Sequence, residues 1–239
     1  ICSDPVAPAS LIAHAEAIGA DLWLLGRDFN YAGDKQQWNY GGRAQRRNSL
    51  AYPGLRGANQ LLNASAALAA LEVLRMELPV GAQEVRTGLV LVELPGRFQV
   101  LPGRPTVILD VAHNPHAASG LAQNLGNMGF HPYTYAVFGI MEDKDVGGVI
   151  APMAPFIDHW CVADLPSPRS ASSGDLVARL EALPAGDAKP GERSITSFAD
   201  PGAAFANAMS RAGENDRIVV FGSFYTVAGV MAARKTSPH

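Results

Sequence analysis

The stretch TVILDVAHNPH, residues 106–116, decides how the second half of this chain folds. Its first four residues are apolar or β-branched, which favours a buried strand, and Asp110 follows where that strand would end. Asn114 and Pro115 are typical of the first positions of a helix. The stretch therefore predicts a strand over 106–110 that leads into a helix over 115–128.

The same alternation of strand and helix continues toward the carboxyl terminus. We expect further strands over 133–140, 157–163 and 194–198, a strand over 217–221 that closes the sheet, and helices over 146–153, 173–183, 201–212 and 226–234. Residues 184–193 are expected to form a loop. Regular alternation of this kind predicts an α/β fold: a Rossmann-like, mostly parallel sheet with helices on both faces.

The residues before this region have a different pattern. Pro95 and Gly96 interrupt the chain, and we place a domain boundary there, with one domain over 1–92 and another over 93–239. In the first domain we expect helices over 7–20, 57–76 and 82–90, and small antiparallel strands near 22–25, 29–31, 38–40 and 49–52.

Composition excludes several classes of protein. The chain has 239 residues, 48% of them hydrophobic and 17% charged, so it can bury a core. No apolar run approaches the roughly 20 residues of a membrane helix, and a net charge of −3 offers no basic surface for nucleic acid. Cys2 and Cys161 are too few for a disulfide framework, which favours a reducing, cytoplasmic location. Because the chain opens on Ile1 without a signal peptide, we expect a fragment.

The carboxyl ends of the predicted strands carry the candidate site residues, because ligands of open α/β sheets bind where strands end and helices begin. His113 at a helix start is suited to a phosphate or carboxylate, and Asp110 to a ribose hydroxyl. The alternative is that Asp110 and Asn114 cap the helix and that the histidines lie at its solvated start. His113 and His116 have the spacing of zinc ligands but no third ligand, so we expect no metal site.

Four more residues of this kind lie near other predicted strand ends or the domain boundary. Lys144 is placed to reach an anion, unless its loop only caps a helix, and Ser223 follows a glycine that allows close approach or simply a tight turn. Arg97 would supply a cation to a site between domains or lie on the surface. Arg169, in the loop 166–172, would bind an acidic substrate or belong to a helix cap.

Two nucleotide-binding motifs are absent from the sequence. None of the four lysines follows a glycine, so there is no P-loop, and no G-x-G-x-x-G follows a predicted strand. The chain therefore has no nucleotide cradle of a recognisable type.

Four motifs occur together in one order: LPGRF at 94–98, DVAHNPH at 110–116, MEDKD at 141–145 and GSFY at 222–225. With them the whole chain resembles the bacterial dihydrofolate synthase/folylpolyglutamate synthase family of the Mur ligase superfamily. The D-x-A-H-N-P motif is shared across the superfamily, whereas LPGRF is more specific to the folate branch.

The resemblance implies an ATP-dependent amide ligase that phosphorylates the carboxylate of dihydropteroate or a folate and joins it to L-glutamate. It implies that Asn63, Arg97 and Asp110 bind ATP, that His113 is catalytic, near the transferred phosphoryl group or the glutamate, and that Ser223 and Lys144 lie on the glutamate side. It further implies a monomeric complete enzyme, with the P-loop and the Mg²⁺ ligands upstream of Ile1. Residues 1–92 would then be the end of the ATP-binding domain, and the fragment alone would be inactive.

Two alternatives remain open. One is a cell-wall amino-acid ligase of the same superfamily, and the other is a noncatalytic ligand-binding module that keeps the fold. A P-loop motif in the codons upstream of Ile1 would argue against the noncatalytic module.

Overall fold

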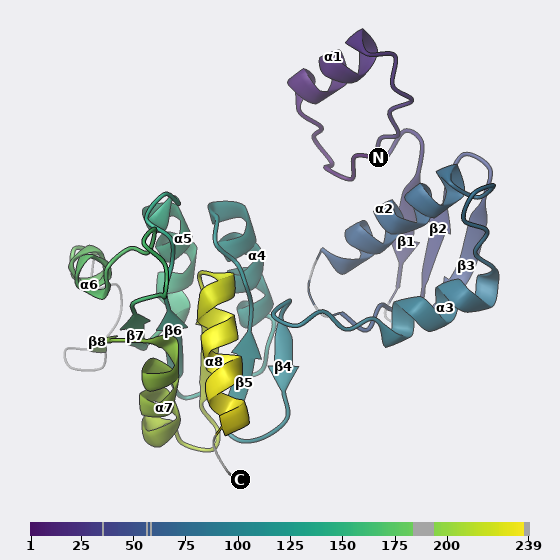
Figure 1. The fold of residues 1–239 in the computed structure, drawn as a ribbon. Coiled ribbons are helices and arrows are strands. Elements are labelled where there is room, and N and C mark those ends of the chain that lie inside the picture. Colours follow the sequence, from purple (N-terminus) through teal and green to yellow (C-terminus); the bar gives the residue numbers. More distant parts are fainter. Residues whose placement is uncertain (35, 56, 58, 184–193, 237–239) are drawn as a thin grey trace. The chain divides into compact units, whose positions relative to one another are not determined.

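The computed structural model describes residues 1–34, 36–55, 57, 59–183 and 194–236. The chain divides into two compact units, Ile1–Glu93 and Leu94–His239, and Figure 1 shows the elements of each. The loop expected over 184–193 lies outside the described residues. No described helix combines the length and the apolar character that crossing a membrane requires.

The first unit contains a three-stranded antiparallel sheet and three helices. Its elements are α1 (Ala9–Ala17), β1 (Asn30–Gly33), β2 (Trp38–Gly41), β3 (Arg46–Leu50), α2 (Gln60–Val73) and α3 (Ala82–Leu91). The side chains of Trp38 and Tyr40 point from the same face of β2 into a small core, where they pack with Leu68 and Ala69 of α2. Buried Glu72 of α2 accepts a hydrogen bond from the Tyr40 hydroxyl.

Two of the strands expected in this unit are wrong or displaced. Residues 22–25 form only single bridges, Leu24 with Cys2 and Leu25 with Phe29, because the chain turns at once: the amides of Arg27 and Asp28 both donate to the Leu24 carbonyl. The strand expected at 49–52 is Arg46–Leu50 instead. The strand was missed because its sequence is mostly polar, and it is recognised only by its pairing with β2.

The second unit contains a six-stranded sheet in the order β4-β5-β9-β6-β7-β8. The strands are β4 (Gln99–Leu101), β5 (Thr106–Leu109), β6 (Thr134–Phe138), β7 (His159–Ala163), β8 (Ser194–Phe198) and β9 (Arg217–Phe221). All neighbours are parallel except β4 and β5. The sequence did not reveal the three-residue edge strand β4. The last strand does not close the sheet at an edge but lies between β5 and β6, because crossover helices separate chain order from spatial order.

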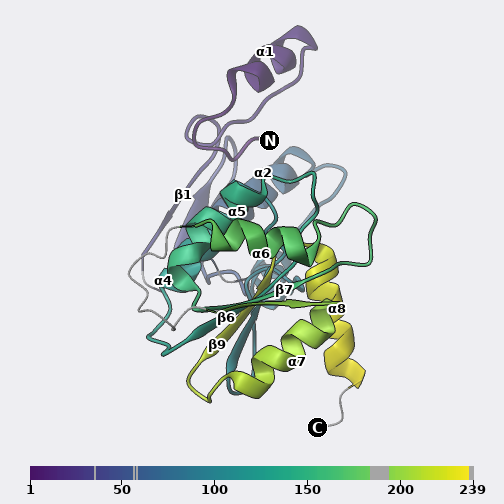
Figure 2. The same ribbon diagram turned by 90° about the vertical axis from the view of Figure 1, so that its left-hand side faces the viewer.

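Helices cover both faces of this sheet, as the sequence predicts (Figure 2). One face holds α4 (Pro115–Gly126), α5 (Val146–Met153) and α6 (Ser173–Glu181), with a short 3₁₀ turn at Ala154–Phe156, and the other holds α7 (Pro201–Arg211) and α8 (Phe224–Thr236). Alternate strand residues point to opposite faces. Phe138 and Phe221 enter the first core, whereas Val137 and Val220 enter the second.

Candidate active site

The candidate site lies at the edge of the sheet where β5, β9, β6 and β7 end. These strands are parallel, so their carboxyl ends and the loops that follow share one edge. A cavity of about 250 Å³ opens there. Its lining brings together the predicted residues His113, Lys144 and Ser223, along with Met141, Ser167, Arg169, Gly222, Phe224 and Tyr225.

Close backbone contacts hold these loops together. Gly222 has φ +104°, and a Cβ atom there would lie 2.5 Å from the Gly139 carbonyl oxygen. The Gly222 amide donates to the Ala112 carbonyl at 2.9 Å, and the Thr226 hydroxyl donates to the Gly139 carbonyl at 2.7 Å. The loops after β5, β6 and β9 are therefore tied to one another, and only glycine fits at position 222.

His113 is oriented by its own loop. Its Nδ1 lies 2.8 Å from the Val111 carbonyl oxygen, which can only accept, so Nδ1 carries a proton. In the neutral ring Nε2 is then an acceptor. The ring centroid lies 6.1 Å from that of Phe224 at the start of α8. The arrangement suits a residue that accepts a proton at Nε2.

The described residues provide no metal site of the ordinary kind. His116 is exposed at the start of α4, and no group of three or more His, Cys, Asp and Glu side chains within the described part of the chain lies close enough to hold an ion.

Asp110 joins two segments rather than capping a helix. Its carboxylate accepts hydrogen bonds from the amides of Phe98, at 2.9 Å, and Ala112, at 2.8 Å. Burial raises the pKa of Asp110, against the lowering effect of those two amides and of Arg97. The capping alternative holds for Asn114 alone, whose Oδ1 accepts from the Ala117 amide at the start of α4.

Arg97 lies beside the cavity. It is exposed, and its guanidinium carbon is 5.7 Å from the centroid of the Phe224 ring, a distance at which a cation interacts with an aromatic face. Phe224 thus contacts Arg97 and His113 together. The structure places a cation, an imidazole and the amino terminus of α8 at one end of the site.

Arg169 is the residue whose importance the sequence left undecided. Its Nη2 lies 2.8 Å from both carboxylate oxygens of Asp143, and Lys144 Nζ lies 3.5 Å from the same carboxylate. Hydrogen bonds from Arg169 lower the pKa of Asp143. The helix-capping role falls to Ser172 instead. A signal was present, since the loop at 166–172 follows a strand parallel to the others.

Asn63 belongs to the first unit. It is exposed on α2, and its amide nitrogen lies 3.5 Å from the Gln60 side-chain oxygen. Its predicted contact with ATP stays a prediction.

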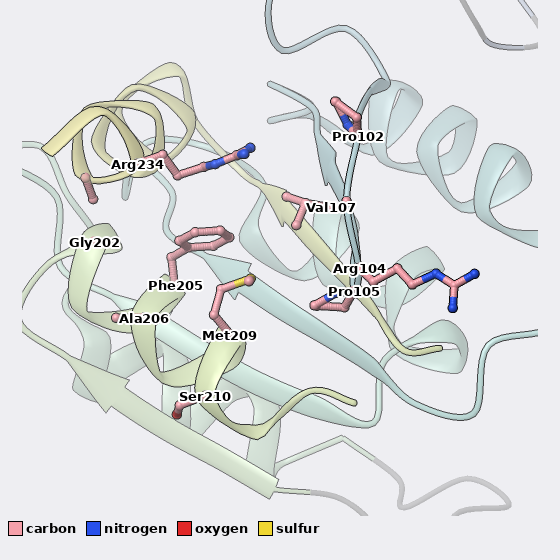
Figure 3. Close-up of a pocket in the computed structure, with 12 residues that line it drawn as sticks. Pro102, Arg104, Pro105, Val107, Gly202, Phe205, Ala206, Met209, Ser210 and Arg234 are labelled. Atoms are coloured by element: carbon pink, nitrogen blue, oxygen red, sulfur yellow. The ribbon is translucent and has the colours of Figure 1, made fainter. Parts of the chain in front are cut away.

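A larger cavity, of about 660 Å³, lies beside the opposite, amino-terminal end of β5. Figure 3 shows Arg234 of α8 reaching over it toward Val107, with Phe205 and Met209 below, while Arg104 points away. None of the predicted site residues lines it. Because α/β sheets bind ligands at the carboxyl ends of their strands, the smaller cavity is the better candidate.

Residues 96–224 match the family described as Mur ligase, glutamate ligase domain. The chain belongs to the Mur ligase family. The matched region contains the strand ends and loops that form the site. It begins at Gly96, within the LPGRF motif, and ends at Phe224, within GSFY.

Individual relatives of this Mur ligase chain are folate enzymes by name. This chain is 34% identical over 231 residues to a dihydrofolate synthase/folylpolyglutamate synthase of Escherichia coli, and the match covers 97% of this chain and 50% of the relative. The enzyme of the same name from Haemophilus influenzae is 28% identical, with 95% and 54% covered. The chain spans about half the length of the curated relatives it matches.

Solved structures agree with this assignment. FolC of E. coli in complex with DHPP and ADP superimposes with a TM-score of 0.85 at 32% identity, covering 98% of this chain and 52% of that one. A bifunctional folylpolyglutamate synthase/dihydrofolate synthase with Mn, AMPPNP and L-glutamate bound gives 0.83 at 35% identity, covering 98% and 52%. The α/β fold with its mostly parallel sheet is thereby confirmed.

Proposed function

We propose that this chain is part of an ATP-dependent ligase that forms an amide bond between L-glutamate and dihydropteroate or a folate. The observation that carries the proposal is the meeting of His113, Lys144 and Ser223 in one cavity, in a chain similar to dihydrofolate synthase/folylpolyglutamate synthase over almost its whole length. Residues 1–92 would be the end of an ATP-binding domain, and 93–239 the glutamate ligase domain.

The proposed reaction has two steps. A carboxylate oxygen of the pteroate or folate attacks the γ-phosphorus of ATP, which gives an acyl phosphate and releases ADP. The amine of glutamate then attacks the acyl carbon, so that an amide forms, phosphate leaves and the amine loses a proton. Both steps concentrate negative charge, which cations and helix amino termini stabilise.

We assign Asn63, Arg97 and Asp110 to ATP. Arg97 would stabilise phosphate charge, and Asp110 would accept from a ribose hydroxyl through the lone pairs that Phe98 and Ala112 leave free. One related structure contains ADP and another AMPPNP with Mn, which supports nucleotide and divalent-cation use. The Mg²⁺ ligands are expected upstream of Ile1.

We assign His113, Ser223 and Lys144 to the glutamate end of the reaction. With its Nδ1 proton held by Val111, His113 can accept a proton at Nε2 as the amine attacks. The Ser223 hydroxyl and the amides at the start of α8 would bind a carboxylate, and the Lys144 ammonium would neutralise it. We further propose a monomeric, cytoplasmic enzyme without nucleic-acid partners.

The test is a ligase assay on the complete protein that contains this chain. Incubation with ATP, L-glutamate and dihydropteroate or tetrahydrofolate should give the glutamylated product and an equal amount of ADP. A muramyl precursor offered with amino acids is the competing substrate. Turnover of the muramyl precursor alone would favour a cell-wall ligase, and absence of turnover with any acceptor would favour a noncatalytic module.

A further inference from the structure

Arg169 lines the cavity but has no part in the roles assigned so far. Its side chain is 67% exposed, so a ligand in the cavity can reach it. Only Nη2 donates to another side chain within the described part of the protein, and both of its bonds go to Asp143. The N–H groups on Nε and Nη1 are therefore left for a ligand, and the bond to Asp143 shows that a carboxylate suits this guanidinium.

The backbone of Arg169 is firmly placed. Its carbonyl accepts from the Glu142 amide at 2.8 Å, and its amide donates to the Ser167 hydroxyl at 3.3 Å. The neighbouring Ser170 bridges Met141 across the loops after β6 and β7. The guanidinium is thus carried by a backbone segment that hydrogen bonds fix to the loop after β6.

The charged side chains that line the cavity are cationic. Among its described lining residues Lys144 and Arg169 are cationic, and none is an Asp or Glu. The amino terminus of α8 adds further positive potential. Asp143 pairs with both cations and offsets one of their two charges, so the lining keeps a net positive charge that suits an anionic ligand.

The order of the strands sets the direction in which such a ligand lies. Along the site edge the strand order is β5, β9, β6 and β7, so His113, Ser223, Lys144 and Arg169 follow one another. With about 4.8 Å between strands, the ends of β5 and β7 lie about 14 Å apart. The reacting amine belongs at the His113 end, and the far end of the amino acid therefore points toward β7.

We propose that Arg169 binds the side-chain carboxylate of the amino-acid substrate and so selects an acidic amino acid. This inference rests on the proposed function. Asp143, which does not line the cavity, holds the guanidinium in place, and Ser223 with Lys144 would bind the other carboxylate. A neutral side chain would form no charged hydrogen bond with the Nε and Nη1 groups that Asp143 leaves free, which is the physical basis of the selection.

The experiment measures steady-state kinetics of the complete ligase with L-glutamate and with L-glutamine. Arg169→Ala should raise the KM for glutamate at least about tenfold and change kcat by less than about threefold, since a charged hydrogen bond to the ground state is lost. The preference for glutamate over glutamine should fall by a similar factor. Arg169→Lys should restore part of it.

Two further variants separate binding from positioning. Arg179→Ala removes an exposed arginine of α6 outside the cavity lining and should leave all constants unchanged. Asp143→Ala should keep the preference for glutamate, because Arg169 remains. Equal loss of that preference in Asp143→Ala and Arg169→Ala would assign Arg169 to positioning Lys144 and overturn the proposal.

Failure of this inference differs from failure of the proposed function. If the unchanged ligase uses glutamate and Arg169→Ala has the same KM and preference, Arg169 has no such role and the function stands. If the unchanged ligase does not consume ATP with glutamate and any folate, both are wrong.

Discussion

At the scale of single residues, Arg97 and Asp110 carry the nucleotide assignment. Arg97→Ala in the complete ligase removes a cation that would bind phosphate, a loss of about 1.5–3 kcal/mol, so the KM for ATP should rise at least about tenfold. Asp110→Ala should raise it too and also loosen residues 96–98, because the Phe98 amide loses its acceptor. Arg104→Ala, which removes only an exposed ion pair with Glu214, is the matched control. Unchanged constants for ATP in both variants would remove the assignment.

Gly222 is the residue on which the shape of the site depends most. Gly222→Ala places a methyl group against the Gly139 carbonyl at a backbone angle that alanine avoids, and should cost about 3 kcal/mol of folding free energy. Urea unfolding measured by circular dichroism checks this. Gly174→Ala in α6 has only Ser172 Oγ within 4 Å, at 3.9 Å, and should have little effect. Equal midpoints for the two variants would contradict the tight packing of the loops.

Cys161 is buried in β7, and this burial raises the pKa of its thiol to about 11. At pH 8 the thiolate is rare and inaccessible, so a thiol reagent should modify Cys2 in the folded chain and Cys161 only after unfolding. The raised pKa stabilises the fold below about pH 8.5, the ordinary value for a thiol, and this contribution falls as the pH rises toward 11. Fast modification of both thiols in the native chain would show that β7 opens readily.

At the scale of elements, four helices of the second unit begin on side-chain caps: α4 at Asn114, α5 at Asp145, α6 at Ser172 and α7 at Asp200. Asp200 accepts from the Ala203 amide at 2.8 Å and does not line the candidate cavity. Asp200→Ala should lower the free energy of unfolding by about 1 kcal/mol without changing any kinetic constant. Asp200→Asn, which keeps an acceptor, should recover most of the loss.

The caps explain why so much of the second unit was readable in sequence. Apolar strands such as Val107–Leu109 and cap residues such as Asn114 are local signals. From them the strands and helices could be predicted with ends that differ from the structure by a few residues. Strand order is not local. Nothing in residues 217–221 themselves says that β9 lies between β5 and β6.

The site was predictable in part for the same reason. Each strand end could be named separately, and parallel strands guarantee that His113, Ser223 and Lys144 share an edge. The bond between Arg169 and Asp143 joins two loops 26 residues apart, and the contact of Phe224 with Arg97 joins residues much farther apart still. Such contacts depend on tertiary packing, which composition and spacing do not encode.

At the scale of the whole molecule, the proposed reaction requires a phosphate-binding loop and metal ligands in addition to the residues assigned above. The sequence has no P-loop, and the described residues offer no group of metal ligands. The 239-residue chain alone should therefore form no amide product from ATP, dihydropteroate and glutamate. The complete protein, assayed at the same concentration, is the positive control. Turnover by the chain alone would overturn the proposal that ATP binding and Mg²⁺ binding need residues outside it.

The central claim is that this chain serves a ligase that works through an acyl phosphate. Dihydropteroate labelled with ¹⁸O in its carboxylate, incubated with the complete protein, ATP and L-glutamate, tests it most directly. Mass spectrometry should find the glutamylated product and one ¹⁸O atom in each inorganic phosphate released. Product formed with unlabelled phosphate, or no product with glutamate at all, would contradict the account.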